Sequence, residues 1–373
     1  MSGIYIHIPF CARRCVYCGF FSTTHDALRS SYVRAVIDEL HLRRAYLGGS
    51  EVRTIYIGGG TPSHLALDDL SLLLRSVLEA APRAAEVTVE CNPDDVTAAL
   101  CDGLLKMGVN RVSMGIQCFD DARLRQLHRR HDARQAVEAV EMLHRAGFHN
   151  LSIDLMFGFP GQTVSEFDSD LSQALRLGVP HLSAYSLMYE EGTPLYRQLE
   201  QGLIHETDEE TLRRMYDLLC DRLTSAGYEH YEISNFALPG YRSRHNSSYW
   251  TPTPYLGLGA GAHSYDLSSR QWNVSDVAAY IRSIERGEVP YEREELDAPT
   301  RVNDRITTAL RTCEGLDLEA VAQTEGERYA RLIHESSQPY LRDGLLLLAG
   351  RRLILTRAGI HVSDLIMSDL MIV

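Results

Sequence analysis

A short β-type run leads directly into three closely spaced cysteines near the N-terminus of this 373-residue chain: Ile4-Tyr5-Ile6-His7-Ile8-Pro9-Phe10-Cys11-Ala12-Arg13-Arg14-Cys15-Val16-Tyr17-Cys18. The run Ile4–Ile8 is predicted to be a strand, so the three thiols stand together at its end. The carboxyl ends of parallel strands are where a barrel fold places its active site. The rest of the chain repeats this strand-and-loop unit.

Six strand–helix units follow one another from residue 3 to about residue 190. In Asp132–Arg145, for example, Ala136, Val140 and Leu143 share one helix face and Gly147 closes the helix. Successive units of this kind predict a parallel sheet covered by helices, and six units are fewer than the eight of a complete barrel. We therefore expect an α/β fold with a partial six-stranded parallel barrel. The expected strands are Ile4–Ile8, Thr54–Ile57, Val87–Glu90, Arg111–Gly115, Leu151–Met156 and Leu182–Leu187.

The pattern changes after residue 190. A helix is predicted over Asp208–Ala226, with Thr207 as its N-cap and Gly227 at its end. The following segment, Tyr228–Tyr265, is rich in Tyr, Gly, Pro, His and Asn, and it is too irregular for one long element. We expect residues 1–190 to form the barrel core and residues 191–297 to extend it.

Residues 298–373 are expected to form a smaller C-terminal unit. The sequence predicts a helix over Arg301–Arg311, a hairpin of Leu345–Leu348 and Leu353–Thr356 about Gly350, and a closing helix over Ser363–Leu370. Helix, hairpin and helix in this order resemble a winged-helix domain.

Charge and composition exclude several classes of function. Hydrophobic residues make up 45% of the chain and charged residues 23%, which is typical of a globular protein. Lys and Arg total 37 against 50 Asp and Glu, a net charge of −13, which argues against a nucleic-acid binder and a winged-helix regulator. The longest apolar runs, such as Leu345–Ala349, are too short to span a bilayer. Because no signal-peptide pattern precedes the cysteines, we expect a cytoplasmic protein.

The three cysteines fit an iron–sulfur cluster better than the alternatives. Eight cysteines are too sparse for a disulfide scaffold, and no second Cys/His pair supports a structural zinc site. A 4Fe–4S cluster takes one thiolate per iron, so Cys11, Cys15 and Cys18 would leave one iron open to a ligand with an amine and a carboxylate. The remaining cysteines are scattered singly and are expected to take no part: Cys91, Cys101, Cys118, Cys220 and Cys313.

Seven motifs in order make the chain recognisable: Tyr5-Ile6-His7-Ile8-Pro9-Phe10-Cys11, Gly58-Gly59-Gly60-Thr61-Pro62-Ser63, Glu90-Cys91-Asn92-Pro93, Gly115-Ile116-Gln117, Asp154-Leu155-Met156-Phe157-Gly158-Phe159-Pro160-Gly161, Tyr231-Glu232-Ile233-Ser234-Asn235 and His245-Asn246-Ser247-Ser248-Tyr249-Trp250. Together with Cys-x-x-x-Cys-x-x-Cys, they resemble the radical S-adenosylmethionine (SAM) superfamily. The resemblance narrows to its coproporphyrinogen-oxidase-like branch and, within that, to the HemW-type haem chaperones.

The resemblance implies a SAM site beside a 4Fe–4S cluster. Gly58–Thr61 follows a strand, where glycines allow backbone amides to approach a charged ligand closely. The carboxylate of Glu90 could accept hydrogen bonds from ribose hydroxyls. Taken singly, each such residue would more often be a satisfied polar group at a barrel rim; taken together, they favour a binding site. The residues that the resemblance places around SAM are Tyr5, Tyr17, Gly59, Gly60, Thr61, Glu90, Gln117, Arg129, Asp154, Met188 and His263.

The segment Tyr241–Trp250 carries a different chemistry. A histidine nitrogen can bind haem iron, Tyr249 and Trp250 offer flat apolar faces, and Arg242 and Arg244 could pair with propionates. The resemblance implies that this motif handles haem, with His245 as the leading axial ligand. The alternatives are that His245 only braces the barrel's open edge, and that haem binds through His263 or a cysteine.

Two departures separate the chain from the oxidases of this branch. Those enzymes carry a fourth cysteine where this sequence has Phe20, and a long segment precedes their cluster motif. We therefore expect a haem chaperone that carries a 4Fe–4S cluster and SAM and delivers haem to a client protein of unknown identity. The alternative is a radical SAM, oxygen-independent coproporphyrinogen III oxidase, which would decarboxylate porphyrinogen propionates. Whether the chain forms a homodimer stays open.

Overall fold

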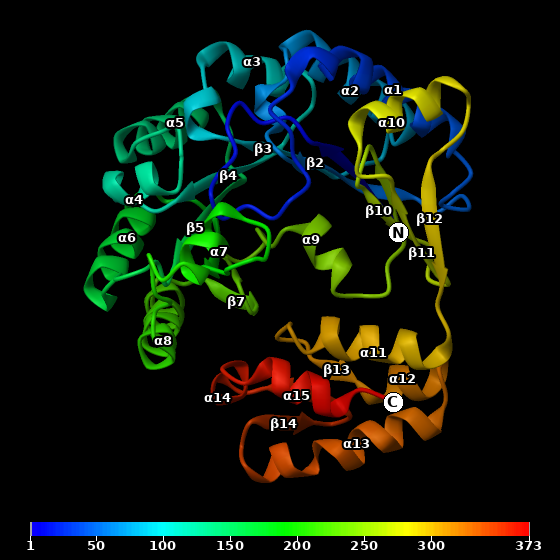
Figure 1. Ribbon diagram of the computed structural model, residues 1–373. Coiled ribbons are helices and arrows are strands. Elements are labelled where there is room, and N and C mark those ends of the chain that lie inside the picture. The colour runs from blue at the N-terminus through cyan, green and yellow to red at the C-terminus, as the bar shows by residue number, and fades with distance from the viewer. Residues whose placement is uncertain (1, 373) are drawn as a thin grey trace.

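The computed structural model describes residues 2–372, in which six parallel strands form the curved sheet that the sequence predicts. Each strand pairs in parallel with the next along the chain, and the carboxyl ends therefore meet at one rim of the barrel. Figure 1 shows the helices outside this sheet. The strands are β1 (Ser2–Ile8), β2 (Val52–Gly59), β3 (Glu86–Cys91), β4 (Arg111–Gln117), β5 (Leu151–Phe157) and β6 (His181–Ser186). The helices among and after them are α1 (Arg29–Leu42), α2 (Leu67–Ala80), α3 (Ala98–Lys106), α4 (Asp121–Gln126), α5 (Ala133–Ala146), α6 (Val164–Arg176), α7 (Pro194–Glu200) and α8 (Glu209–Ser225).

The two faces of the sheet differ in polarity. Residues that face the helices are apolar: along β4, for example, Val112, Met114 and Ile116 join one large buried cluster. Because side chains alternate along a strand, the intervening residues face the barrel interior, which we call the lumen. These lumen residues are mostly polar: Tyr5, His7, Thr54, Tyr56, Thr88, Glu90, Arg111, Ser113, Ser152, Asp154, His181 and Ser183.

Strands at both edges enlarge the sheet beyond the prediction. At one edge β9 (Tyr255–Leu258) pairs in parallel with β1, and the antiparallel strands β10 (His263–Tyr265), β11 (Ser269–Asn273) and β12 (Tyr291–Glu295) follow. At the other edge β8 (Asn235–Ala237) and β7 (Glu229–Glu232) complete a sheet of twelve strands within residues 2–372. The segment Tyr228–Tyr265 is thus built of short strands and the short helix α9 (Arg244–Tyr249). The helix α10 (Val277–Glu285) covers α1.

The N-cap predicted for α8 is wrong by one residue. The cap is Asp208, whose carboxylate accepts a hydrogen bond from the Thr211 amide at 2.9 Å. The Thr207 hydroxyl instead donates to the carbonyl oxygens of Gly158 and Phe159, so it holds the loop after β5.

The C-terminal unit has an apolar cluster of its own. The hairpin of β14 (Leu346–Ala349) and β15 (Arg352–Leu355) turns at Gly350, which has a φ of 63°, and α15 (Ser363–Leu370) matches the closing helix expected from the sequence. The predicted first helix is α11 (Ala298–Ala309). The structure adds β13 (Leu316–Asp317), α12 (Leu318–Thr324), α13 (Glu327–Arg342) and α14 (Arg357–Ile360). The winged-helix detail and the three domain boundaries stay predictions.

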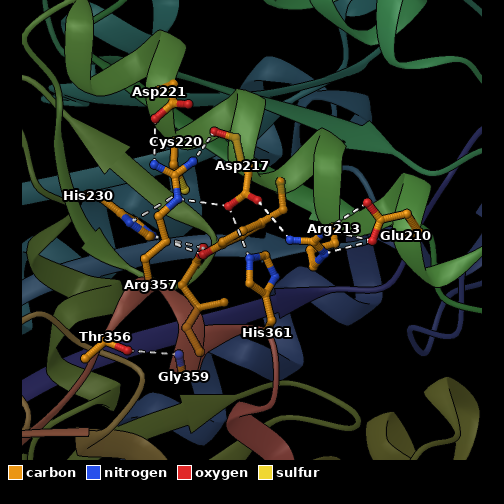
Figure 2. A network of polar contacts seen from close by, with 12 residues as sticks. Glu210, Arg213, Asp217, Cys220, Asp221, His230, Thr356, Arg357, Gly359 and His361 are labelled. Carbon is orange, nitrogen blue, oxygen red and sulfur yellow. Dashed lines mark hydrogen bonds and ion pairs between the residues drawn. The ribbon is translucent and has the colours of Figure 1, made fainter. Parts of the chain in front are cut away.

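Charged side chains attach the C-terminal unit to the barrel. Arg357 of α14 donates to Asp217 at 2.9 Å and to Asp221 at 2.6 Å, both on α8, and His361 lies 3.1 Å from the same Asp217 (Figure 2). A second anchor joins Arg311 to the buried Glu232 at 2.9 Å. No helix among the described residues is long and apolar enough to cross a membrane.

Candidate functional site

The three cysteines of the predicted cluster lie on a partly exposed loop that follows β1. Hydrogen bonds fix this loop to the neighbouring strand ends. The Cys11 amide donates to the Thr23 carbonyl at 2.9 Å, and the hydroxyl of Thr61, just after β2, donates to the Cys11 sulfur at 3.5 Å. Arg129 donates to the Cys15 sulfur at 3.5 Å.

The loop suits a cluster that takes one thiolate from each cysteine. Hydroxyl and guanidinium donors already face two of the sulfurs, and such donors stabilise thiolates. Burial raises the pKa of the Cys11 and Cys18 thiols, so a positively charged metal centre would be needed to deprotonate them at neutral pH. Within residues 2–372 no three His, Cys, Asp or Glu side chains converge on one ion, and a cubane does not require such convergence because each thiolate binds a different iron. The ligand set stays a prediction.

The glycine run at the end of β2 lies directly against the cysteine loop. The Gly60 amide donates to the Ile8 carbonyl at 2.8 Å, and a Cβ at Gly60 would lie 2.8 to 2.9 Å from backbone atoms of Ile8, Pro9 and Phe10. Only glycine therefore fits at position 60 with this backbone. Gly59 adopts a φ of 110°, and a Cβ there would meet the His7 ring.

Two carboxylates enter the lumen below this loop. Glu90 accepts hydrogen bonds from the Tyr56 hydroxyl at 2.7 Å and from the Gly59 amide at 3.0 Å. Burial raises the pKa of Glu90 to about 7, although these two donors oppose the shift. Burial also raises the pKa of Asp154 to about 6. Such shifted carboxyls are typical of binding sites.

Arg129 ties three elements of the site together. Besides the Cys15 sulfur, its guanidinium bonds the Asn92 side chain at 2.8 Å and the Gly115 carbonyl of β4. Gln117 ends β4 after a bulge and has a φ of 74°, a strained conformation for a residue with a side chain. The amide group of Gln117 lies over Gly115 beside Arg129.

The other residues predicted around SAM lie farther around the rim. The Tyr5 hydroxyl lies 3.0 Å from His7 in the lumen, and Tyr17 is half-buried within the cysteine loop. Met188 follows β6 and is 63% exposed. The exposed His263 begins β10, and its ring stacks on that of Trp272 with the two ring centres 6.1 Å apart. Among the described residues, neither Met188 nor His263 hydrogen-bonds the group around Glu90.

The short helix α9 lies at the opposite end of the barrel from the cysteines. His245 contacts Thr54, near the start of β2, and its backbone amide donates to Glu86, the first residue of β3, at 2.9 Å. The His245 side chain has no solvent exposure, and its two ring nitrogens lie 2.8 Å from the Thr54 hydroxyl and 2.9 Å from the Tyr249 hydroxyl. Burial lowers the pKa of His245 to about 3. His245 is therefore a neutral brace, and neither nitrogen is presented to a ligand.

The neighbours of His245 are engaged as well. Tyr249 packs edge-on against His245, and the Arg311 guanidinium of the C-terminal unit lies 5.1 Å from the centre of the Trp250 ring. Arg242, expected to pair with a propionate, bonds Glu229 at 2.9 Å and Glu314 at 2.7 Å. The segment Tyr241–Trp250 therefore contacts both the barrel and the C-terminal unit, the latter through Arg242 and Trp250.

Comparison with known proteins identifies the family. The radical SAM superfamily model matches residues 5–174. The protein named heme chaperone HemW of Bacillus subtilis is 34% identical over 366 residues, which cover 96% of both chains. The protein of the same name from Mycobacterium tuberculosis strain H37Rv is 34% identical over 99% of this chain and 94% of its own. The chain belongs to the HemW family.

Two further comparisons, one with the C-terminal unit and one with the whole fold, agree with membership of the HemW family. The HemN C-terminal domain model matches residues 296–362. The solved coproporphyrinogen III oxidase HemN of Escherichia coli, described as a radical SAM enzyme, superposes with a TM-score of 0.85 over 99% of this chain and 89% of its own. At 22% identity this likeness shows the fold alone.

Sequence reasoning missed three residues of this HemW-family site. Asn92 bonds Arg129, Tyr56 bonds Glu90, and Arg111 lies in the lumen with its Nε and Nη1 atoms unpaired among the described residues. The position of Asn92, two residues after Glu90 within one motif, could have indicated it. Tyr56 and Arg111 stand in predicted strands, where alternation marks them as facing away from the helices.

Proposed function

We propose that this chain is a haem chaperone that binds haem and passes it to a client protein while carrying a 4Fe–4S cluster and SAM. The observation that carries the proposal is similarity over nearly the whole chain to proteins named heme chaperone HemW. The polar lumen beneath the cysteine loop supports it, since it offers hydrogen-bonding groups for a charged ligand.

The residues of the rim fit the two groups that the family implies. Cys11, Cys15 and Cys18 would hold the cluster, which supplies an open iron for the amine and carboxylate of SAM. Gly59 and Gly60 let the end of β2 pack directly against His7 and the backbone of the cysteine loop, and Glu90 holds acceptor oxygens inside the lumen. Arg129 keeps the cysteine loop and the end of β4 at a fixed separation, because it bonds both.

For haem, the structure favours the alternative in which His245 braces the barrel. A ligating imidazole needs an accessible nitrogen, and His245 would have to leave two hydrogen bonds and a sealed site to provide one. His263 is exposed, and the adjacent Trp272 offers a flat aromatic face. We therefore propose His263 as the first axial ligand to test.

Haem titration followed by the Soret band tests this assignment. We expect His263→Ala to weaken haem binding and shift the Soret maximum. His334→Ala is the matched control, because His334 is an exposed histidine on α13 of the C-terminal unit. Wild-type binding and spectrum in His263→Ala would eliminate this ligand. A protein that binds no haem at all would contradict the chaperone function itself.

The second candidate is a radical SAM coproporphyrinogen III oxidase, which the shared fold with HemN favours. Phe20 stands where the oxidases of the resembled branch carry a fourth cysteine, and it is 70% exposed. Coproporphyrinogen decarboxylation is measured on the anaerobically reconstituted protein beside the haem titration. Decarboxylation at enzymatic turnover would replace the chaperone proposal with this one.

A further inference from the structure

Arg111, the first residue of β4, is a buried cation with unsatisfied hydrogen-bond donors among the described residues. Its side chain is 1% exposed and faces the lumen. Its Nε and Nη1 atoms have no hydrogen-bond partner within residues 2–372, and it forms no ion pair there. A guanidinium buried in this way is costly, because it loses its hydration without replacement.

A second buried arginine shows how this fold treats a purely structural one. Arg43 bonds Glu39 at 3.2 Å, the Gly257 carbonyl at 3.1 Å, Ser264 at 3.1 Å and Gln271 at 3.0 Å. Both terminal nitrogens of that guanidinium are satisfied by the protein. By contrast, two of the three guanidinium nitrogens of Arg111 receive no such contact within residues 2–372, so a structural role alone does not account for it.

The strand register places Arg111 between the two carboxylates of the lumen. On β3, Arg111 pairs with Thr88, and Glu90 is the next inward residue towards the rim. On β5, the inward residues Ser152 and Asp154 rise beside Ser113 and Gly115 of β4. An arginine side chain is about as long as one inward step of two residues, about 6.6 Å. The register therefore places Arg111 one inward step below Glu90 on one neighbouring strand and two inward steps below Asp154 on the other, and its charge acts on both carboxylates.

Arg111 offsets part of the negative charge that Glu90 and Asp154 bring into the lumen. Neither Glu90 nor Asp154 forms an ion pair with a described residue, and Arg129 is directed to Cys15 and Asn92. The negative charge of the three cysteine thiolates would attract the Arg129 guanidinium further when a cluster is bound. The Arg111 charge lowers the pKa of both Glu90 and Asp154 against the larger effect of burial, whereas Arg129 acts in this way on Asp154 alone.

We propose that Arg111 is a positioning residue of the SAM site, a fixed counter-charge that keeps Glu90 and Asp154 ionised as hydrogen-bond acceptors. This inference rests on the proposed SAM site. It predicts that Arg111 sets the lower pH limit of SAM binding without touching the ligand.

The histidines and tyrosines around the two carboxylates stay neutral near neutral pH. The histidine pKa values lie below 6.5 and the tyrosine pKa values above 10, in each case through burial. They are Tyr5 and His7 on β1, Tyr56 on β2, His181 and Tyr185 on β6, Tyr231 on β7, and His245 and Tyr249 on α9. The acidic and basic residues nearby are Glu86 on β3 and Arg129. Glu86 is held by the amides at the start of α9.

The test measures the SAM dissociation constant by calorimetry from pH 5.5 to 8.5 on the reconstituted protein. Wild-type affinity falls on acidification through pH 7 to 6. In Arg111→Met this fall moves up by about one pH unit, so binding is about tenfold weaker on the acid limb and equals wild type at pH 8.5. Arg111→Lys keeps the charge and restores the wild-type profile.

A stability measurement separates this role from a structural one. Replacing an unpartnered buried cation by an apolar side chain of similar length is neutral or stabilising, so Arg111→Met should unfold at the wild-type temperature or above it. An unchanged pH profile in Arg111→Met would overturn the proposal, as would an equal loss of affinity at every pH. A wild-type protein that binds no SAM at any pH would overturn the SAM site itself, and this inference with it.

Discussion

Replacing His245 by alanine should destabilise the barrel rather than merely remove a ligand. The change leaves two buried hydroxyls, those of Thr54 and Tyr249, without their partner. Each unsatisfied group costs about 1 to 3 kcal/mol. The lost ring, which also stacks on Tyr56 at 5.2 Å, leaves a cavity that costs about 2 to 5 kcal/mol more. With partial relaxation we expect a loss of about 4 to 6 kcal/mol, a large part of the 5 to 15 kcal/mol typical of a folded domain.

Urea denaturation followed by circular dichroism measures this loss on the protein without haem. His334→Ala serves as the exposed control and should change the unfolding free energy by less than about 0.5 kcal/mol. The triple variant Thr54→Val, His245→Phe and Tyr249→Phe removes every polar partner at once, so it should recover most of the stability. A loss below about 1 kcal/mol in His245→Ala would refute the bracing role and return His245 to the list of available haem ligands.

Three further predictions concern the rim. Cys15→Ala should abolish the visible absorption of the reconstituted cluster. Cys118→Ala should keep it, because Cys118 is buried and directly follows β4. The reverse result would show that the ligand set is wrong. Gly60→Ala should weaken SAM binding at least tenfold, because the added Cβ displaces the backbone of the cysteine loop. Calorimetry measures this affinity, and a wild-type value would show that SAM binds elsewhere. Asp154→Asn should raise the unfolding free energy by about 1 to 2 kcal/mol above pH 6, where a carboxyl with a raised pKa is ionised at a cost. That gain should vanish below about pH 4, where the carboxyl is protonated in both states; a gain independent of pH would contradict it.

The sequence predicted those features that depend on local pattern. Glu90 and Asp154 could be placed at one rim because the ends of parallel strands converge there, and the α5 helix could be bounded by Asp132 and Gly147. The sealed position of His245 could not be predicted, because its partner Thr54 is 191 residues away in the sequence and no motif near either residue indicates the contact. The strand β9 escaped prediction for a similar reason: it has four residues, and its pairing with β1 is what makes it a strand.

The division between an apolar outer face and a polar lumen has a consequence for how such a protein can change. The buried apolar cluster lies between the strands and the helices that cover them, and it includes residues such as Val112 and Leu155. Mutations on the inner positions of the same strands leave that cluster intact, so selection can alter the lumen one residue at a time while the chain still folds. A barrel built in this way can acquire a new ligand, or lose an old reaction and keep its ligand, without passing through an unfolded ancestor.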